Sequence, residues 1–326
     1  MTPSRLVLAT RRSALALAQS RAFARDLTLK FPGLVIEELH VVTTGDKVQN
    51  VPLSEVGGKG LFTKEIEEAL DRSDAHFAVH SFKDMPVEIS PKFTIACVPK
   101  RADPRDVLVI RTGGGLASLP RGAKVGTSSL RRALQLSIAR PDLVILPLRG
   151  NVDTRLRKLD AGEFDAIVLA AAGLARLGLS ERITEALDPT LVVPAPAQGA
   201  LALECRADDE STRAVLAAMS DPETEIAVAC ERGVMEAVSG NCTVPFGAYA
   251  LRDGDRMRLT AVLALNDGSP ANTSAGASGA THAAVPTPGV APAAPPRRVE
   301  RTDPWPLSPT EAEKIGREAG KTLLNR

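Results

Sequence analysis

The chain has 326 residues and a formal net charge of +1, and its 44% apolar and 24% charged residues are ordinary for a globular protein of two or three domains. A charge so close to zero creates no field that favours nucleic acid or membrane, and aromatic residues, at 3%, are too few for base-stacking platforms. Because the chain has no long apolar run, no signal-peptide pattern in residues 1–30 and only four widely separated cysteines, we expect a cytoplasmic protein with reduced thiols.

The chain opens with a predicted strand and helix. Residues 6–10 form a short apolar run, and residues 14–29 have the periodicity and alanine content of a helix. Ser13 can cap this helix, and the free N–H groups of the first turn together with Arg11 predict an anion site.

A second predicted strand, residues 34–42, leads into a polar, glycine-rich segment at 45–60. This segment is not a phosphate-binding P-loop, because no Ser or Thr follows Lys59. It is either a mobile lid that carries Lys59 and Phe62 or a plain exposed loop, and composition does not separate the two. A helix is predicted after it, at residues 63–70.

The next strand ends in a charged pair. Residues 77–79 are apolar, as in a strand covered on both faces, and the polar residues that follow stop at Pro86. Lys83 and Asp84 therefore lie just past the carboxyl end of a strand, where open α/β sheets bind ligands. Lys83 could hold an anionic substrate and Asp84 could stabilise a developing positive charge, although spacing alone favours a solvated turn with a surface pair.

Two crossovers divide the chain. A strand at 93–98 is followed by a crossover at 103–106, and a second crossover at 193–199 leads into a strand at 201–205 that returns to the first sheet. The simplest topology is a first domain interrupted by a second, with two connections and a cleft between the domains.

The interrupting segment holds the strongest predicted anion site. After a strand at 124–126, a hydroxyl-rich turn starts an amphipathic helix that runs to about residue 139. Simple capping explains one serine but not the whole group, so we interpret it as a carboxylate or phosphate site. The group consists of Thr127, Ser128, Ser129, Arg131 and Arg132.

Three further arginines follow strand ends. Arg149 comes after a strand at 143–148, and Arg155 falls in the first turn of the next helix, where a basic residue is unfavourable unless a ligand needs its charge. Arg176 follows the buried strand at 165–171. The alternation of strands and helices predicts mostly parallel sheets.

The character of the chain changes after residue 221. We predict a helix at 224–238, a hairpin formed by 249–251 and 257–265, and a final helix that begins with a capping box at Ser308 and runs nearly to the end. Residues 268–296 consist almost wholly of Ala, Pro, Gly, Ser and Thr, so we expect a disordered surface insertion.

The four cysteines fall into two groups. Cys97, Cys205 and Cys230 lie in apolar strands or a helix and are most simply buried apolar residues. Cys242 lies in a glycine-containing loop between a helix and a strand, where a thiol can be reached, which hints at a chemical use.

Taken together, these stretches closely resemble the porphobilinogen deaminase (hydroxymethylbilane synthase) family. The match is colinear over residues 1–266 and resumes near 297. The matching segments are residues 9–11, 57–62, 78–84, 103–106, 126–132, 148–151, 198–200 and 242–245.

The resemblance implies an α/β fold with two periplasmic-binding-protein-like lobes, built on mostly parallel sheets, and a small C-terminal α/β domain. The expected boundaries are 1–102 with 197–218 for the first domain, 103–196 for the second, and 219–326 for the third. The insertion at 268–296 is absent from the family's usual third domain.

The resemblance also implies an activity: four porphobilinogen molecules condense stepwise into hydroxymethylbilane with release of ammonia. It implies a dipyrromethane cofactor attached to Cys242 by a thioether, no metal, and a monomer whose partner is the small-molecule substrate. Catalytic roles fall on Asp84 and Lys83. Cofactor contacts fall on Ser13, Lys83, Thr127, Ser128, Ser129, Arg131 and Arg132, and substrate contacts on Arg11, Arg149, Arg155, Arg176 and Gln198.

A second hypothesis is a non-catalytic two-lobed anion-binding protein, since binding proteins share this design. Asp84 beside Lys83, and a loop thiol at Cys242, favour the enzyme, because a passive receptor needs neither.

Overall fold

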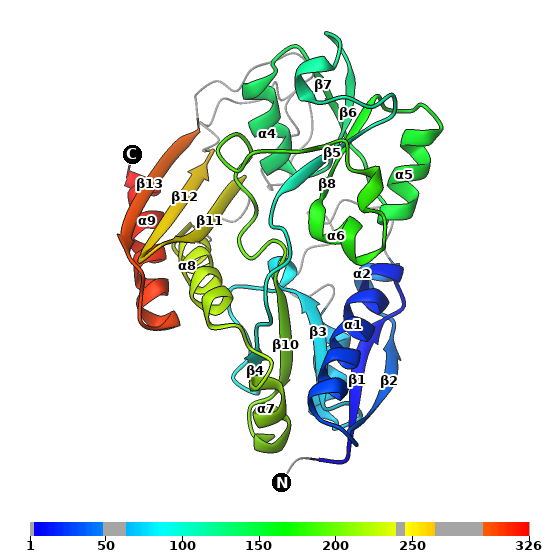
Figure 1. Ribbon diagram of the computed structural model, residues 1–326, viewed down its shortest axis with the longest axis vertical. Helices are drawn as coiled ribbons and strands as arrows, with labels where there is room; N and C mark the ends of the chain where they lie inside the picture. The colour runs from blue at the N-terminus through cyan, green and yellow to red at the C-terminus, as the bar shows by residue number, and fades with distance from the viewer. Residues whose placement is uncertain (1–2, 48–62, 239–244, 265–295, 326) are drawn as a thin grey trace, which may run out of the picture. The chain divides into compact units, whose positions relative to one another are not determined.

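The computed structural model describes residues 3–47, 63–238, 245–264 and 296–325 (Figure 1). The chain forms two compact units. The first comprises 1–104, 170–181 and 197–228, and the second comprises 105–169, 182–196 and 229–326. The three-domain boundaries expected from the sequence stay a prediction.

The first unit is built on a five-stranded sheet. Its strands, in spatial order, are β2 (Val35–Val41), β1 (Arg5–Arg11), β3 (Phe77–Ser81), β10 (Leu201–Arg206) and β4 (Phe93–Cys97). β1 pairs in parallel with β2 and with β3, whereas β10 is antiparallel to β3 and β4. β10 begins opposite the carboxyl end of β3, where Leu201 pairs with Ser81, so it runs against its neighbours.

Helices cover both faces of this sheet. Phe23 and Leu27 of α1 pack with Phe77 on one face, and Ile66 and Leu70 of α3 pack on the other. This double coverage is why the central strands β1 and β3 carry runs of consecutive apolar residues. The helices of the unit are α1 (Ala14–Lys30), α2 (Thr44–Lys47), α3 (Lys64–Asp71), the 3-10 helix η1 (Phe82–Asp84), α6 (Ala171–Arg176) and α7 (Glu210–Ala217).

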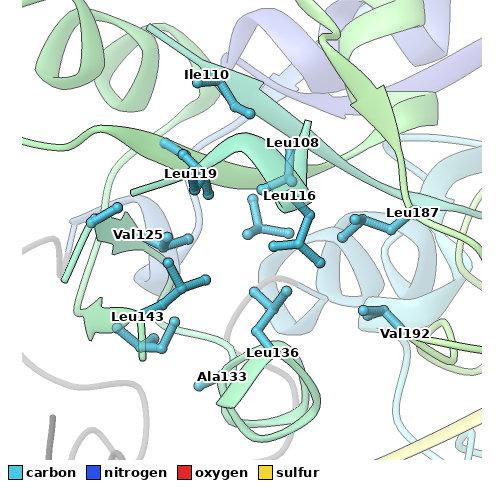
Figure 2. Close-up of a cluster of buried hydrophobic side chains, with 14 residues drawn as sticks. Leu108, Ile110, Leu116, Leu119, Val125, Ala133, Leu136, Leu143, Leu187 and Val192 are labelled. Atoms are coloured by element: carbon cyan, nitrogen blue, oxygen red, sulfur yellow. The ribbon is translucent and has the colours of Figure 1, made fainter. Parts of the chain in front are cut away.

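The second unit contains another five-stranded sheet. Its order is β7 (Val144–Leu146), β6 (Lys124–Gly126), β8 (Ala166–Ala170), β5 (Asp106–Ile110) and β9 (Glu185–Ala186). β6 is parallel to β7 and β8, and β9 is antiparallel to β5. Leu108 of this sheet packs with Leu136 of α4 (Leu130–Ala139) in one buried cluster (Figure 2). The other helices of this part of the chain are α5 (Val152–Asp160) and the 3-10 turn η2 (Leu116–Ser118), and the 3-10 turn η3 (Ser180–Arg182) falls at the boundary between the two units along the chain.

A small antiparallel sheet and two helices complete the chain. The sheet consists of β11 (Phe246–Asp253), β12 (Arg256–Leu263) and β13 (Arg297–Pro304), and α8 (Pro222–Val238) and α9 (Pro309–Asn325) are the helices. α9 packs against β12 and β13, and its Gly316 lies so close to the Cys230 carbonyl of α8 that a side chain would collide with it. The predicted hairpin and final helix are confirmed, while β13 is a strand that the sequence did not reveal.

The α/β class is therefore confirmed, with two mixed, mainly parallel sheets and a small C-terminal sheet. Among the described ranges, no helix is both long and apolar enough to cross a bilayer. Most of the 45–60 segment and of the 268–296 insertion lies outside the described residues.

Candidate active site

The carboxyl end of β3 presents the predicted charged pair. β3 is buried up to His80, and η1 then turns the chain so that Asp84 is exposed and Lys83 is half-buried. Within the part of the chain that the structure describes, the Asp84 carboxylate has no hydrogen bond or ion pair. An acidic group so placed can face a cationic ligand without first breaking an internal contact.

Gln198 ties Lys83 to the second crossover. The Lys83 Nζ lies 3.4 Å from Gln198 Oε1, while Gln198 Nε2 donates to the Pro104 carbonyl at 2.7 Å. The Gln198 carbonyl accepts from Arg101 Nε at 2.8 Å. Gln198 is fully buried and its side chain bridges Lys83 and the Pro104 carbonyl, while its substrate contact stays a prediction.

The backbone after Gln198 is tightly confined. Gly199 has φ +87°, and a Cβ there would come within 2.6 Å of the Ala102 carbonyl, so only glycine fits. Its carbonyl accepts from Arg176 Nη2 at 2.7 Å. Burial lowers the pKa of Arg176 to about 10, and no acidic side chain contributes to that shift. Arg176 is thus a half-buried cation that would gain from an external anion.

Ser13 and a polar network hold the neighbouring strand end. Ser13 Oγ accepts from the Ala16 N–H at 3.3 Å, which confirms the cap of α1. Gln19 Nε2 donates to Ser81 Oγ at 2.9 Å, so α1 is also bound to the end of β3. β1 and β3 are parallel, so Arg11 and Ser81 end at the same edge of the sheet. Sequence reasoning missed Gln19, although a glutamine within the alanine- and leucine-rich helix could have indicated a polar contact.

In the second unit, the hydroxyl-rich turn is bound internally. Ser129 caps α4 by accepting from the Arg132 N–H at 3.4 Å, and the Ser129 N–H donates to Thr127 Oγ1 at 3.2 Å. Ser128 Oγ exchanges hydrogen bonds with the backbone of Leu148, at 2.9 and 3.0 Å. All three hydroxyls therefore take part in shaping the turn at the start of α4.

Arg131 and Arg132 are both about 94% buried, each with a relative exposure of 6%. Both guanidinium groups donate to Asp106, at 2.6 Å from Arg131 Nη1 and 2.8 Å from Arg132 Nε. Sequence reasoning gave Asp106 no role, although an acidic residue opening an otherwise apolar strand could have drawn attention.

Arg149 and Arg155 extend this positive region. Arg155 is half-buried, and its Nε donates to the Gly150 carbonyl at 2.7 Å. Burial, and repulsion by Arg132 and Arg149, lower the pKa of Arg155 to about 10. The three guanidinium groups thus lie near enough to repel one another, an arrangement that a polyanionic ligand would stabilise.

The three described cysteines are free and buried, as predicted. Burial raises the pKa of Cys97 and of Cys205 to about 12, and it raises the pKa of Cys230 as well. These thiols are therefore poor nucleophiles. Cys242, Lys59 and Phe62 lie outside the described residues.

A buried histidine–glutamate contact behind the end of β3 was also missed. His80 Nε2 lies 3.0 Å from Glu204 Oε2, and Glu204 is fully buried in β10. Burial and the Glu204 charge raise the pKa of Glu67 on α3. The signal in the sequence was a single acid within the apolar strand at 201–205.

Two models of one protein family match the chain. A family model described as "Porphobilinogen deaminase, dipyromethane cofactor binding domain" matches residues 6–214, and "Porphobilinogen deaminase, C-terminal domain" matches residues 225–285. The chain belongs to the porphobilinogen deaminase family.

Relatives that bear this name support the assignment. The porphobilinogen deaminase of Sorangium cellulosum is 54% identical over 98% of this chain and 99% of its own. The one from Roseiflexus castenholzii is 50% identical over 81% of this chain and 87% of its own, and the one from Syntrophobacter fumaroxidans is 44% identical over 100% and 96%. Among solved structures, the periplasmic aliphatic sulphonate binding protein SsuA from Escherichia coli is 14% identical, with a TM-score of 0.37, over 73% of this chain and 70% of that one.

The residues present fit the dipyrromethane cofactor of the porphobilinogen deaminase family. The fit rests on donor chemistry within the second unit: the two buried guanidinium groups of Arg131 and Arg132 share one carboxylate, that of Asp106, which leaves a net positive charge. A ligand that carries several carboxylates supplies the missing negative charge.

Proposed function

We propose that this chain catalyses the stepwise condensation of four porphobilinogen molecules into hydroxymethylbilane, with release of one ammonia per unit, as a transferase of porphyrin and haem biosynthesis. The observation that carries this proposal is the 54% identity with a porphobilinogen deaminase over 98% of the chain. The non-catalytic anion-binding hypothesis is not favoured, because the matching relatives carry the name of the enzyme.

Asp84 is the proposed catalytic carboxylate. Loss of ammonia from porphobilinogen leaves a cationic azafulvene, and a carboxylate beside it stabilises that charge. At about 4 Å the attraction is about 1 kcal/mol in bulk water and about 4 kcal/mol at an effective dielectric constant of 20. Since Asp84 is exposed, the larger value applies only once substrate excludes water from around it. That range corresponds to about one to three decades of rate.

The arginines are the proposed binding groups. Each porphobilinogen carries an acetate and a propionate, so the growing product accumulates carboxylates. Lys83 assists at the reacting end, held by Gln198. The other proposed substrate contacts are Arg11, Arg149, Arg155 and Arg176.

Cys242 is the proposed attachment point of the dipyrromethane. Support comes from elimination among the described thiols, because the other three cysteines are buried with raised pKa values. When bound, the cofactor supplies the pyrrole on which the product chain is assembled. Ser13, Lys83, Thr127, Ser128, Ser129, Arg131 and Arg132 would hold its carboxylates.

We further propose a cytoplasmic monomer that binds neither nucleic acid nor membrane, with Lys59 and Phe62 on a lid. A net charge of +1 creates no overall field that would attract nucleic acid or a membrane surface. The three buried free cysteines are compatible with a reducing compartment.

The test is Asp84→Asn. We expect turnover of porphobilinogen to fall by about one to three decades while the covalent cofactor is retained in the intact mass. Asp208→Asn is the matched control. Its exposed carboxylate follows β10, and because β10 is antiparallel to β3 it lies at the opposite edge of the same sheet. Near-normal turnover of the Asp84 variant would contradict the assigned role.

A further inference from the structure

One buried carboxylate holds two of the proposed cofactor arginines. Asp106 is 0% exposed and is the first residue of β5. Its Oδ2 accepts from Arg131 Nη1 at 2.6 Å. Its Oδ1 accepts from Arg132 Nε at 2.8 Å, and Arg132 Nη2 lies 2.8 Å from the same oxygen.

Each guanidinium group has a second anchor in the same unit. Arg131 Nη1 also donates to the Val193 carbonyl at 2.7 Å, and Arg132 Nη1 donates to the Val168 carbonyl at 3.0 Å. A planar group held at two points keeps little rotational freedom. The orientation of both arginines is therefore set before any ligand arrives.

Arg131 keeps part of its binding capacity. Both side-chain hydrogen bonds that it donates come from Nη1, and within the described residues its Nε and Nη2 groups have no hydrogen-bond partner. Nε and Nη2 form one edge of the planar fork, the geometry that binds a carboxylate through two parallel hydrogen bonds. Asp106 thus binds the Nη1 nitrogen of Arg131 and leaves the Nε–Nη2 edge available for bidentate binding of another anion.

Asp106 also offsets the positive charges of Arg131 and Arg132. Arg131 and Arg132 carry two positive charges in a buried position, and Arg132 already lowers the pKa of Arg155 by repulsion. The carboxylate reduces the charge of the buried trio to +1. Without it, both guanidinium groups would move toward solvent to recover hydration.

The backbone near Arg131 connects this group to the proposed attachment point. Gly247 on β11 packs so closely that a Cβ there would lie 3.3 Å from Arg131 Cδ and 2.7 Å from the Val193 carbonyl. Gly247 follows Cys242 by five residues, a separation that even an extended chain spans in at most about 17 Å. Arg131 is therefore held beside the strand that leads away from Cys242.

We propose that Asp106 is a positioning residue for cofactor loading: it orients Arg131 and Arg132 so that the free edge of Arg131 receives a carboxylate of the dipyrromethane. This inference rests on the proposed function. Asp106 touches neither substrate nor cofactor and acts only through the two arginines.

The experiment follows loading directly. Full-length cofactor-free protein is incubated with porphobilinogen, and intact mass records how fast the chain gains one dipyrromethane. We expect Asp106→Asn to slow this gain at least about tenfold, because misplaced binding groups cost that much or more. Asp142→Asn is the matched control: it removes a bidentate partner from Arg140 at the other end of α4, at 2.7 and 2.8 Å, and should load within about twofold of wild type.

The outcomes separate three cases. Slow loading of Asp106→Asn with normal loading of Asp142→Asn supports the proposal, and loading of both at the wild-type rate overturns it. If Asp106→Asn does not unfold cooperatively, Asp106→Glu replaces it. That variant keeps the negative charge, but its side chain is one methylene longer and so shifts the positions of both arginines. If it gains the cofactor at the wild-type rate, the proposal is equally overturned. If the wild-type chain itself gains no dipyrromethane, the proposed function fails instead.

Discussion

Arg155 should make the ligand-free protein less stable than it could be. Its pKa of about 10, against an ordinary 12.5, corresponds to about 3 kcal/mol of penalty on the charged form, at 1.36 kcal/mol for each pKa unit. Its position in the first turn of α5 adds about 0.5 kcal/mol, because a cation there opposes the helix dipole. Against this stands the hydrogen bond to the Gly150 carbonyl, which contributes about 1–1.5 kcal/mol.

We therefore expect Arg155→Met to raise the free energy of unfolding by about 1–2 kcal/mol in the absence of ligand, measured by urea denaturation. Arg157→Met is the matched control. Arg157 lies on the same helix but is exposed and in the last turn, where a cation is favourable. Its replacement should therefore lower the free energy of unfolding by less than about 1 kcal/mol. Added sulphate should reduce the difference in the free energy of unfolding between Arg155→Met and wild type, because the anion can pair with Arg155 in the wild-type protein only. If Arg155→Met is less stable than Arg157→Met, the argument that this site stores uncompensated charge is wrong.

Three other predictions follow from single features. Cys242→Ala should carry no dipyrromethane by intact mass, and finding the cofactor on Cys97, Cys205 or Cys230 would refute the attachment site. Glu67 has a higher pKa in the folded protein than in the unfolded protein, where it is about 4.3. Its contribution to stability is therefore fully present below about pH 4.3 and is lost as pH rises through the pKa of the folded protein. Glu204→Gln removes a charge that repels the Glu67 carboxylate, so as pH rises above about 4.3 the thermal midpoint of unfolding should fall less steeply than in wild type; an unchanged slope would contradict the coupling. Deleting residues 268–296 should leave activity within about twofold, because Leu263 pairs with Arg297 and a four-residue hairpin can join the strands; a large loss would show that the segment has a role.

Local patterns predicted the strand ends and helix starts well. The helix cap at Ser13, the charged pair after β3 and the helix after Ser129 all follow from a few neighbouring residues, and the structure places each element within one or two residues of its expected bounds. β13 escaped because its residues are mostly charged and only Val299 is buried. Its strand character depends on pairing with β12, across more than thirty intervening positions.

The residues that orient the site were hidden for the same reason. Asp106 meets Arg131 across 25 positions, and His80 meets Glu204 across 124. Periodicity carries no information about such pairs, because each partner looks like an isolated exception within its own strand. What the sequence does show is the exception itself: an acid within or at the start of an apolar strand must have a partner if it is buried, since an unpaired buried charge is too costly.

The arginines of the candidate site differ in how their charge is balanced. Arg131 and Arg132 share an internal carboxylate, whereas Arg155 and Arg176 donate to backbone carbonyls and have lowered pKa values with no acidic contribution. A charge balanced inside the protein remains rigid whether or not a ligand is present, which suits a ligand attached permanently. A guanidinium charge without an internal partner destabilises the protein until an anion binds, and again after the anion leaves. Such a charge suits a substrate that binds only transiently. The proposed division between cofactor and substrate arginines thus corresponds to a physical difference between the two pairs.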